Sequence, residues 1–134
     1  MAYQRLRALT ILWFLFMTWL SHQDGAHTLK TSSSLANGLA KRLGFLQVNL
    51  DVLNLQLRKL AHVAVFFVLT VLFCLTLYVG RKPAWPLLFL IVWCYADERS
   101  KRWIAGRHFS WVDVGLNLLG VAAGGSVALL LCRM

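Results

Sequence analysis

Six polar side chains of the kinds that carry proton transfer, metal binding or phosphate binding lie within or beside apolar stretches of this chain. They are His62, Asp97, Glu98, Arg107, Asp113 and Asn117. Acids with a histidine can bind a divalent cation, and acids, arginine and histidine can equally form an electrostatic network around a lipid phosphate. The chain contains no HExxH, P-loop, GxSxG or dinucleotide-binding pattern, so no standard catalytic motif decides between these chemistries.

The acidic pair Asp97–Glu98 ends an apolar run, and the chain holds only five acids in all. On a helix the two side chains point about 100° apart, and the i+4 spacing pairs Asp97 with Lys101 and Glu98 with Arg102. A solvated helix end with ordinary ion pairs is the simpler interpretation. The short apolar run before the pair argues against it, since it places Asp97 inside or at the edge of the hydrocarbon, where charge is costly.

A second polar pattern falls on one stripe of the last apolar run. The stripe consists of Asp113, Asn117, Gly120 and Gly124. Ser110 is a plausible N-cap with Asp113 at the third helical position, a structural role that leaves Asn117 unexplained. Gly120, Gly124 and Gly125 permit close contact with another helix. We therefore expect Asp113 and Asn117 to face the interior of a helix bundle.

His62 lies one turn after Arg58, on a helix face that also contains position 66. It is either an interfacial histidine without chemistry, or it carries a proton or donates a hydrogen bond to a phosphate. Gly106–Arg107 resembles a turn that directs the arginine toward the helix ends, where it can fork onto a carboxylate or phosphate; a basic surface loop is the alternative. We expect His62 to lie within hydrogen-bond reach of Glu98 or Asp113, because buried acids without partners are too costly.

Composition places these residues in a membrane. The 134-residue chain is 59% hydrophobic with a mean hydropathy of +0.64, whereas soluble domains average about 45–50% apolar residues. A single integral membrane domain over residues 1–134 is the natural interpretation. Fourteen Lys and Arg residues give a net charge of +9. Because they cluster beside apolar segments, the predicted partner is anionic lipid rather than nucleic acid.

The hydropathy pattern predicts an all-α integral membrane fold with four transmembrane helices. Their expected bounds are 6–21, 60–79, 84–104 and 111–131. Leucines at helical spacing predict an amphipathic interfacial helix over about 35–57, between the first and second spans. The basic start and short first apolar run also suit a signal peptide, but the small-residue cleavage site is missing, so we expect a retained helix.

This topology places residues 21–58 and 97–112 on one side of the membrane, and both termini with the turn at 80–83 on the other. Nine of the fourteen positive residues fall on the first side, which by raw count would be cytoplasmic. The basic N-terminus and the short Arg81–Lys82 turn favour cytoplasmic termini instead. We expect the latter, with the polar pocket extracytoplasmic.

At these residues the chain resembles the VanZ-like family of small bacterial membrane proteins, over nearly its whole length. The matching blocks are 58–62, 97–98 with 106–107 and 109–110, 113–124 through Asp113, Asn117, Gly120 and Gly124, and more weakly 21–25. Phe66 departs from the usual tyrosine and Lys101 from the usual glutamine; residues 22 and 24 also differ. The resemblance implies a bacterial cytoplasmic (inner) membrane protein, whose family founder is linked to teicoplanin resistance.

Two functions follow as hypotheses, with metal, cofactor and oligomeric state left open. In the first, the chain binds an anionic lipid or lipid-linked envelope precursor. The candidate ligand-binding residues are Arg58, Lys59, Arg107 and Asn117. In the alternative, it is an enzyme acting on a phospholipid or polyprenyl-linked headgroup. The candidate catalytic residues are His62, Asp97, Glu98 and Asp113. His62 or Glu98 would then be the general base, and Arg107 would stabilise developing charge. A divalent ion could assist the reaction.

Overall fold

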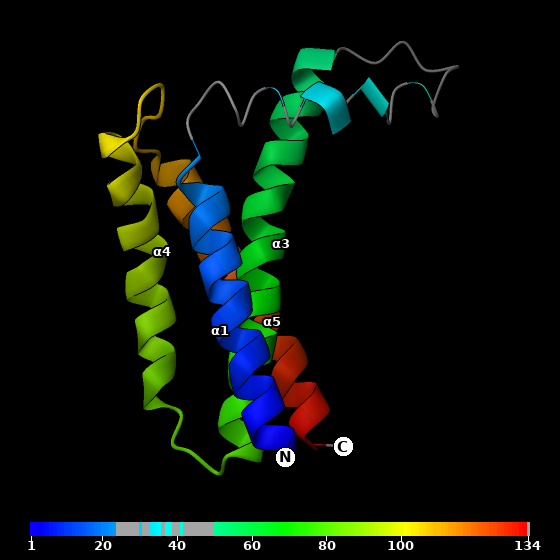
Figure 1. Cartoon of the computed structure of the whole chain (residues 1–134), viewed down its shortest axis with the longest axis vertical. Helices are drawn as coiled ribbons and strands as arrows, with labels where there is room; N and C mark the ends of the chain where they lie inside the picture. Colours follow the sequence, from blue (N-terminus) through cyan, green and yellow to red (C-terminus); the bar gives the residue numbers. More distant parts are fainter. Residues whose placement is uncertain (24–29, 31–32, 36, 39–40, 42–49, 134) are drawn as a thin grey trace.

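The computed structural model is all-helical and describes residues 1–23, 30, 33–35, 37–38, 41 and 50–133, with no β-strand among them (Figure 1). Its helices are α1 (Ala2–Ser21), α3 (Leu50–Val79), α4 (Leu88–Ser100) and α5 (Trp111–Arg133). One-turn 3₁₀ helices, Trp85–Leu87 and Lys101–Trp103, flank α4. Most of the predicted interfacial segment before residue 50 lies outside the described residues.

Helices α3 and α5 are the two candidate membrane spans by length and composition. The candidate spans are Val52–Val79 and Trp111–Cys132, and their 18-residue apolar windows have mean hydropathies of 2.5 and 1.9, respectively. At 1.5 Å per residue, the 30 residues of α3 extend about 45 Å, well beyond the roughly 30 Å hydrocarbon core. One end of α3, which carries Arg58 and Lys59, can therefore project past the hydrocarbon.

The expected start of the second helix at residue 60 was wrong, because α3 begins at Leu50. Residues 50–57, assigned by sequence to an interfacial helix, are the first turns of α3. The physical reason is that neither glycine nor proline interrupts 50–60, so a helix propagates through the polar positions at little cost. The other differences are smaller: α1 starts at Ala2 rather than 6, and α4 ends at Ser100 before a 3₁₀ turn.

The closest helix contact joins α5 to α3 through two glycines. A Cβ atom added at Gly120 would collide with the carbonyl oxygen of Val63, and one added at Gly124 would collide with that of Phe67. The prediction of a close-packing stripe is confirmed for both positions. Gly125 was wrongly included, since an added Cβ there meets nothing within 4 Å. This contact fixes the register between the helices that carry His62 and Asn117.

Helix α1 packs against α3 through polar as well as apolar contacts. Thr10 Oγ1 lies 2.9 Å from Thr76 Oγ1, and the Trp13 indole N–H donates to the Val65 carbonyl at 3.0 Å. Met17 is buried in the core beside Phe66 and Leu69. Hydrogen bonds of this kind fix helix–helix contacts where lipid supplies little hydrophobic driving force.

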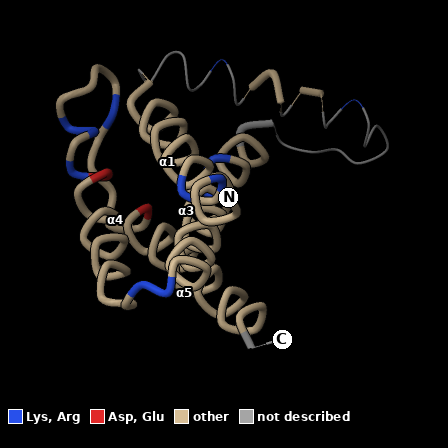
Figure 2. The backbone as a smooth tube through the Cα atoms, turned by 60° about the horizontal axis from the view of Figure 1, so that its bottom comes forward, with Lys and Arg blue, Asp and Glu red and all other residues tan. Residues whose placement is uncertain are grey.

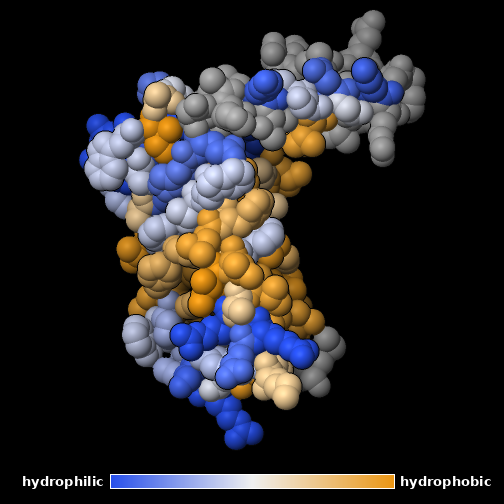
Figure 3. Space-filling view, in the orientation of Figure 1, coloured by the Kyte–Doolittle hydropathy of each residue, from blue (hydrophilic) through white to orange (hydrophobic). Residues whose placement is uncertain are grey.

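The two ends of the bundle differ in what they carry. Figure 1 shows both termini and the turn between α3 and α4 at one end, and the connection between α4 and α5 at the other, as the sequence predicted. Figure 3 shows an apolar band across the middle of the visible face, flanked at both ends by hydrophilic residues. Figure 2 shows acidic residues on α4 and at the start of α5, at the same end of the molecule, with basic residues on the adjoining loop. The candidate polar residues thus share one end of the molecule.

Candidate functional site

A cavity of about 190 Å³ lies between α1, α3 and the C-terminal end of α4. One part of its wall is apolar and is formed by Met17, Leu20, Leu35, Leu57, Ala61, Val65 and Phe66. The other part is polar and is formed by Ser21, Gln23, Arg58, His62, Asp97, Lys101 and Arg107. The cavity is therefore amphipathic, with cationic groups beside an aliphatic surface.

The carboxylates of Asp97 and Glu98 share one buried cation. Lys101 is 1% exposed, and its Nζ contacts Glu98 Oε2 and lies 3.6 Å from Asp97 Oδ2. Both acids are almost fully buried, which excludes the alternative of a solvated helix end, against which the short apolar run had already argued. The predicted partner of Asp97 is confirmed, whereas Glu98 pairs with Lys101 and the predicted partner Arg102 is exposed.

Asp97 is also anchored to α1. Ser21 Oγ donates to Asp97 Oδ2 at 2.8 Å, which links the last residue of α1 to α4. The second oxygen, Oδ1, is buried and has no hydrogen-bond partner among the described residues. A buried acceptor without a donor is costly, so the charge of Lys101 carries much of the stabilisation at this carboxylate.

Three helices meet in a chain of hydrogen bonds that begins at His62. Its Nδ1 lies 2.9 Å from Asn117 Oδ1, and the Asn117 amide nitrogen donates to the Cys94 carbonyl at 3.4 Å. Asn117 is fully buried. The second contact orients the amide, because a flipped Asn117 would set its oxygen against the Cys94 oxygen. His62 therefore donates from Nδ1 and presents Nε2 toward other groups.

Asp113 has the two roles that its position suggested. Its backbone N–H donates to Ser110 Oγ at 3.3 Å, which confirms Ser110 as the N-cap of α5. Its Oδ2 lies 3.8 Å from His62 Nε2. The expectation of a hydrogen bond between His62 and a carboxylate was wrong, since this separation is too long and the partner of His62 is Asn117.

Arg107 reaches the cavity from the loop between α4 and α5. Gly106 adopts a φ of 71°, which confirms the predicted turn, and Arg107 Nη1 donates to the Gln23 carbonyl at 3.4 Å. Burial and then the positive charge of Arg58 lower the pKa of Arg107, while the carboxylates of Glu98, Asp97 and Asp113 raise it. Two arginines therefore repel each other beside a cavity that both of them line.

The structure gathers most of the predicted site residues and separates one of them. His62, Asp97, Glu98, Asp113, Asn117, Arg58 and Arg107 lie at the cavity or directly behind it. Lys59 is half-exposed and does not line the cavity. Sequence reasoning did not assign Ser21, Gln23 or Lys101 to the site. Ser21 lay within the weakest block of the family resemblance, and Lys101 was a departure from the family pattern.

Comparison with known proteins identifies no relative of this chain. No family model, curated protein or solved structure matches the chain. The VanZ-like resemblance therefore rests on the residues that carry it.

Proposed function

We propose that this protein is a multi-pass membrane protein of the VanZ-like type that binds an anionic, phosphate-bearing lipid or lipid-linked envelope intermediate. The observation that carries the proposal is the cavity that places Arg58 and Arg107 beside an aliphatic wall. A phosphate between the two arginines would relieve their mutual repulsion and accept charge-assisted hydrogen bonds. Leu57 and Val65 would contact the first carbons of an acyl or polyprenyl chain.

The size of the cavity limits how much of a ligand it can enclose. Its volume of about 190 Å³ is below the roughly 300–1,000 Å³ of sites that enclose whole drug-sized ligands. It suits a headgroup with the start of one chain, the remainder staying in the bilayer. The negative charges of Asp97 and Glu98 do not prevent phosphate binding, because Lys101 already contacts both carboxylates.

Lipid retention tests the proposal with a matched pair of variants. Arg107→Gln and Arg102→Gln each remove one positive charge from the same region, but only Arg107 lines the cavity and Arg102 is exposed. We expect the first to lose bound phosphatidylglycerol or polyprenyl phosphate severalfold, measured by native mass spectrometry, and the second to retain it. Equal retention by both variants would refute the site. Inorganic phosphate as a third probe separates headgroup recognition from recognition of the whole lipid.

The four-span topology and its orientation belong to the same proposal. We place α1 and α4 across the bilayer beside α3 and α5, with cytoplasmic termini and an extracytoplasmic cavity in a bacterial inner membrane. Impermeant thiol labelling of Lys82→Cys and Arg102→Cys in intact cells tests this. We expect label only at position 102, and label only at position 82 would reverse the orientation.

An enzymatic function is a second candidate, favoured by the convergence of His62, Glu98 and Asp113 from three helices. Turnover of either lipid with Mg²⁺, Mn²⁺ or Zn²⁺ present would support it. The family resemblance adds a cellular test. Expression in a teicoplanin-susceptible bacterium should raise tolerance in a manner that depends on Arg107, and unchanged tolerance would count against the association.

A further inference from the structure

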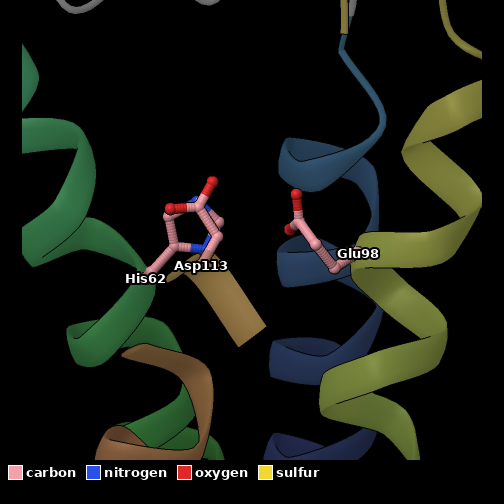
Figure 4. A group of neighbouring side chains, drawn as sticks. All are labelled: His62, Glu98 and Asp113. Atoms are coloured by element: carbon pink, nitrogen blue, oxygen red, sulfur yellow. The ribbon is translucent and has the colours of Figure 1, made fainter. Parts of the chain in front are cut away.

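We propose that His62, Glu98 and Asp113 form a binding site for a divalent transition-metal ion, Zn²⁺ or Mn²⁺. One ligand atom from each of these residues lies within 4.8 Å of the others. Figure 4 shows the three side chains projecting toward one another from α3, α4 and the first turn of α5. The site differs from the arginine pair of the proposed lipid site and does not depend on lipid binding.

Lone pairs of His62 and Asp113 face each other in this group. Asn117 accepts the Nδ1–H of His62, so a neutral His62 presents the lone pair of Nε2. The nearest carboxylate oxygen, Asp113 Oδ2, is 3.8 Å away and also presents lone pairs. Two acceptors that face each other in a partly buried site are stabilised by a cation between them, which a proton on His62 or a metal ion can supply.

The spacing of the three ligand atoms suits a single metal ion. Zinc bonds to histidine nitrogen and carboxylate oxygen are about 2.0–2.2 Å long, so one ion can join ligand atoms up to about 4.2 Å apart. The 3.8 Å between His62 and Asp113 already meets this limit. The widest separation in the group, at most 4.8 Å, closes with a side-chain movement of less than about 1 Å, within the reach of a glutamate rotamer.

The groups behind His62 and Glu98 orient these two side chains. Histidines that bind metals almost always donate their other ring N–H to an acceptor that fixes the tautomer. Asn117 has this position, and its contact with the Cys94 carbonyl fixes its own orientation. Glu98 can contact Lys101 with one oxygen and an ion with the other, because a carboxylate has two.

The donor set indicates the class of metal. One imidazole nitrogen with two carboxylates suits Zn²⁺ or Mn²⁺, whereas Ca²⁺ and Mg²⁺ favour oxygen ligands alone. Three protein ligands leave at least one coordination position open. Since His62 also lines the cavity, an ion held there would lie at the cavity wall.

Metal binding to tag-free protein in lipid-free detergent tests the proposal. The probes are Zn²⁺ by equilibrium dialysis with elemental analysis, and Co²⁺ by its visible absorption. We expect stoichiometric binding by the wild type and by His108→Ala, which alters an exposed histidine. His62→Ala and Asp113→Asn should each weaken binding at least tenfold, and Asn117→Ala should cost on the order of 10–100-fold in affinity.

The outcomes separate this site from the lipid proposal. Asp113→Asn preserves the shape of the side chain. It therefore tests metal binding even if His62→Ala does not fold. If the wild type binds Zn²⁺ no more tightly than Asp113→Asn does, the proposal is overturned. The cation at His62 is then a proton. Tighter binding of Mg²⁺ than of Zn²⁺ or Mn²⁺ overturns the metal class. Arg107→Gln removes a positive charge that interacts with Glu98 and Asp113, so it should bind metal at least as tightly as the wild type while it loses lipid. Loss of lipid and loss of metal are therefore distinguishable.

Discussion

Asn117 and His62 form a 2.9 Å hydrogen bond that joins α5 to α3 at the polar end of the bundle. The same amide donates to the Cys94 carbonyl of α4, so one fully buried side chain connects three helices. The sequence could place Asn117 only on the inner face of the fourth apolar helix. In the structure, Asn117 determines how the candidate site is assembled.

Replacing Asn117 with leucine should destabilise the fold. The substitution keeps the volume similar but leaves the His62 ring N–H without its acceptor, and a buried unsatisfied polar group costs about 1–3 kcal/mol. It also removes the contact between the Asn117 amide and the Cys94 carbonyl of α4. Thermal unfolding in detergent measures the change. Ser126→Ala is the control, because Ser126 is exposed and bonds only to the Ala122 carbonyl on its own helix. Equal melting temperatures for the two variants would contradict the connecting role.

The glycine stripe offers a comparison of closely related positions on α5. Gly120→Ala places a methyl group against the Val63 carbonyl, whereas Gly125→Ala places one in open space. We expect the first to destabilise the α3–α5 contact by about 1–3 kcal/mol, the usual cost of overpacking. The second should be neutral or slightly stabilising, since alanine favours the helix. Folded yield and melting temperature in detergent check this, and similar losses at both positions would mean that the two helices do not meet at Gly120.

How far the sequence could predict this fold depends on the kind of signal. Apolar runs place helices reliably, so α5 begins at Trp111 as expected. The start of α3 could not be read from hydropathy, because its polar first turns project beyond the apolar region and look like a separate segment. Ser110 and Gly106 were found because capping and positive φ leave direct marks in the residue type.

Side-chain partners were harder to predict than elements. The i+4 rule assigned Arg102 to Glu98, but the chain tightens into a 3₁₀ turn at Lys101–Trp103, where positions i and i+3 align. That turn brings Lys101 onto Glu98. The partner of His62 depends on the rotation of α3 against α5, which the Gly120 contact sets in three dimensions. No spacing within one helix encodes it.

Lys101 and Arg102 provide the sharpest test of the buried ion group. Lys101→Gln leaves Asp97 and Glu98 buried without their cation, and breaking such a pair costs on the order of 3–5 kcal/mol. Arg102→Gln removes the same charge from an exposed position and should change stability by less than about 0.5 kcal/mol. Chemical or thermal unfolding of both variants decides the matter. Adding Glu98→Gln to Lys101→Gln should restore part of the loss, since it removes one of the two orphaned charges.

We expect α1 to be retained in the mature protein, because of how it packs rather than because its sequence lacks a signal-peptide cleavage site. The helix forms a wall of the cavity through Met17, Leu20 and Ser21, and Ser21 donates to the buried Asp97. Removal of α1 would expose the core face around Phe66 and leave Asp97 Oδ2 without its hydroxyl donor. Intact mass spectrometry of protein extracted from membranes should therefore show a chain that includes residues 2–21. A mature form beginning after Ser21 would contradict this, and Ser21→Ala, which keeps the helix but removes the bond to Asp97, should lower stability by about 1 kcal/mol or more.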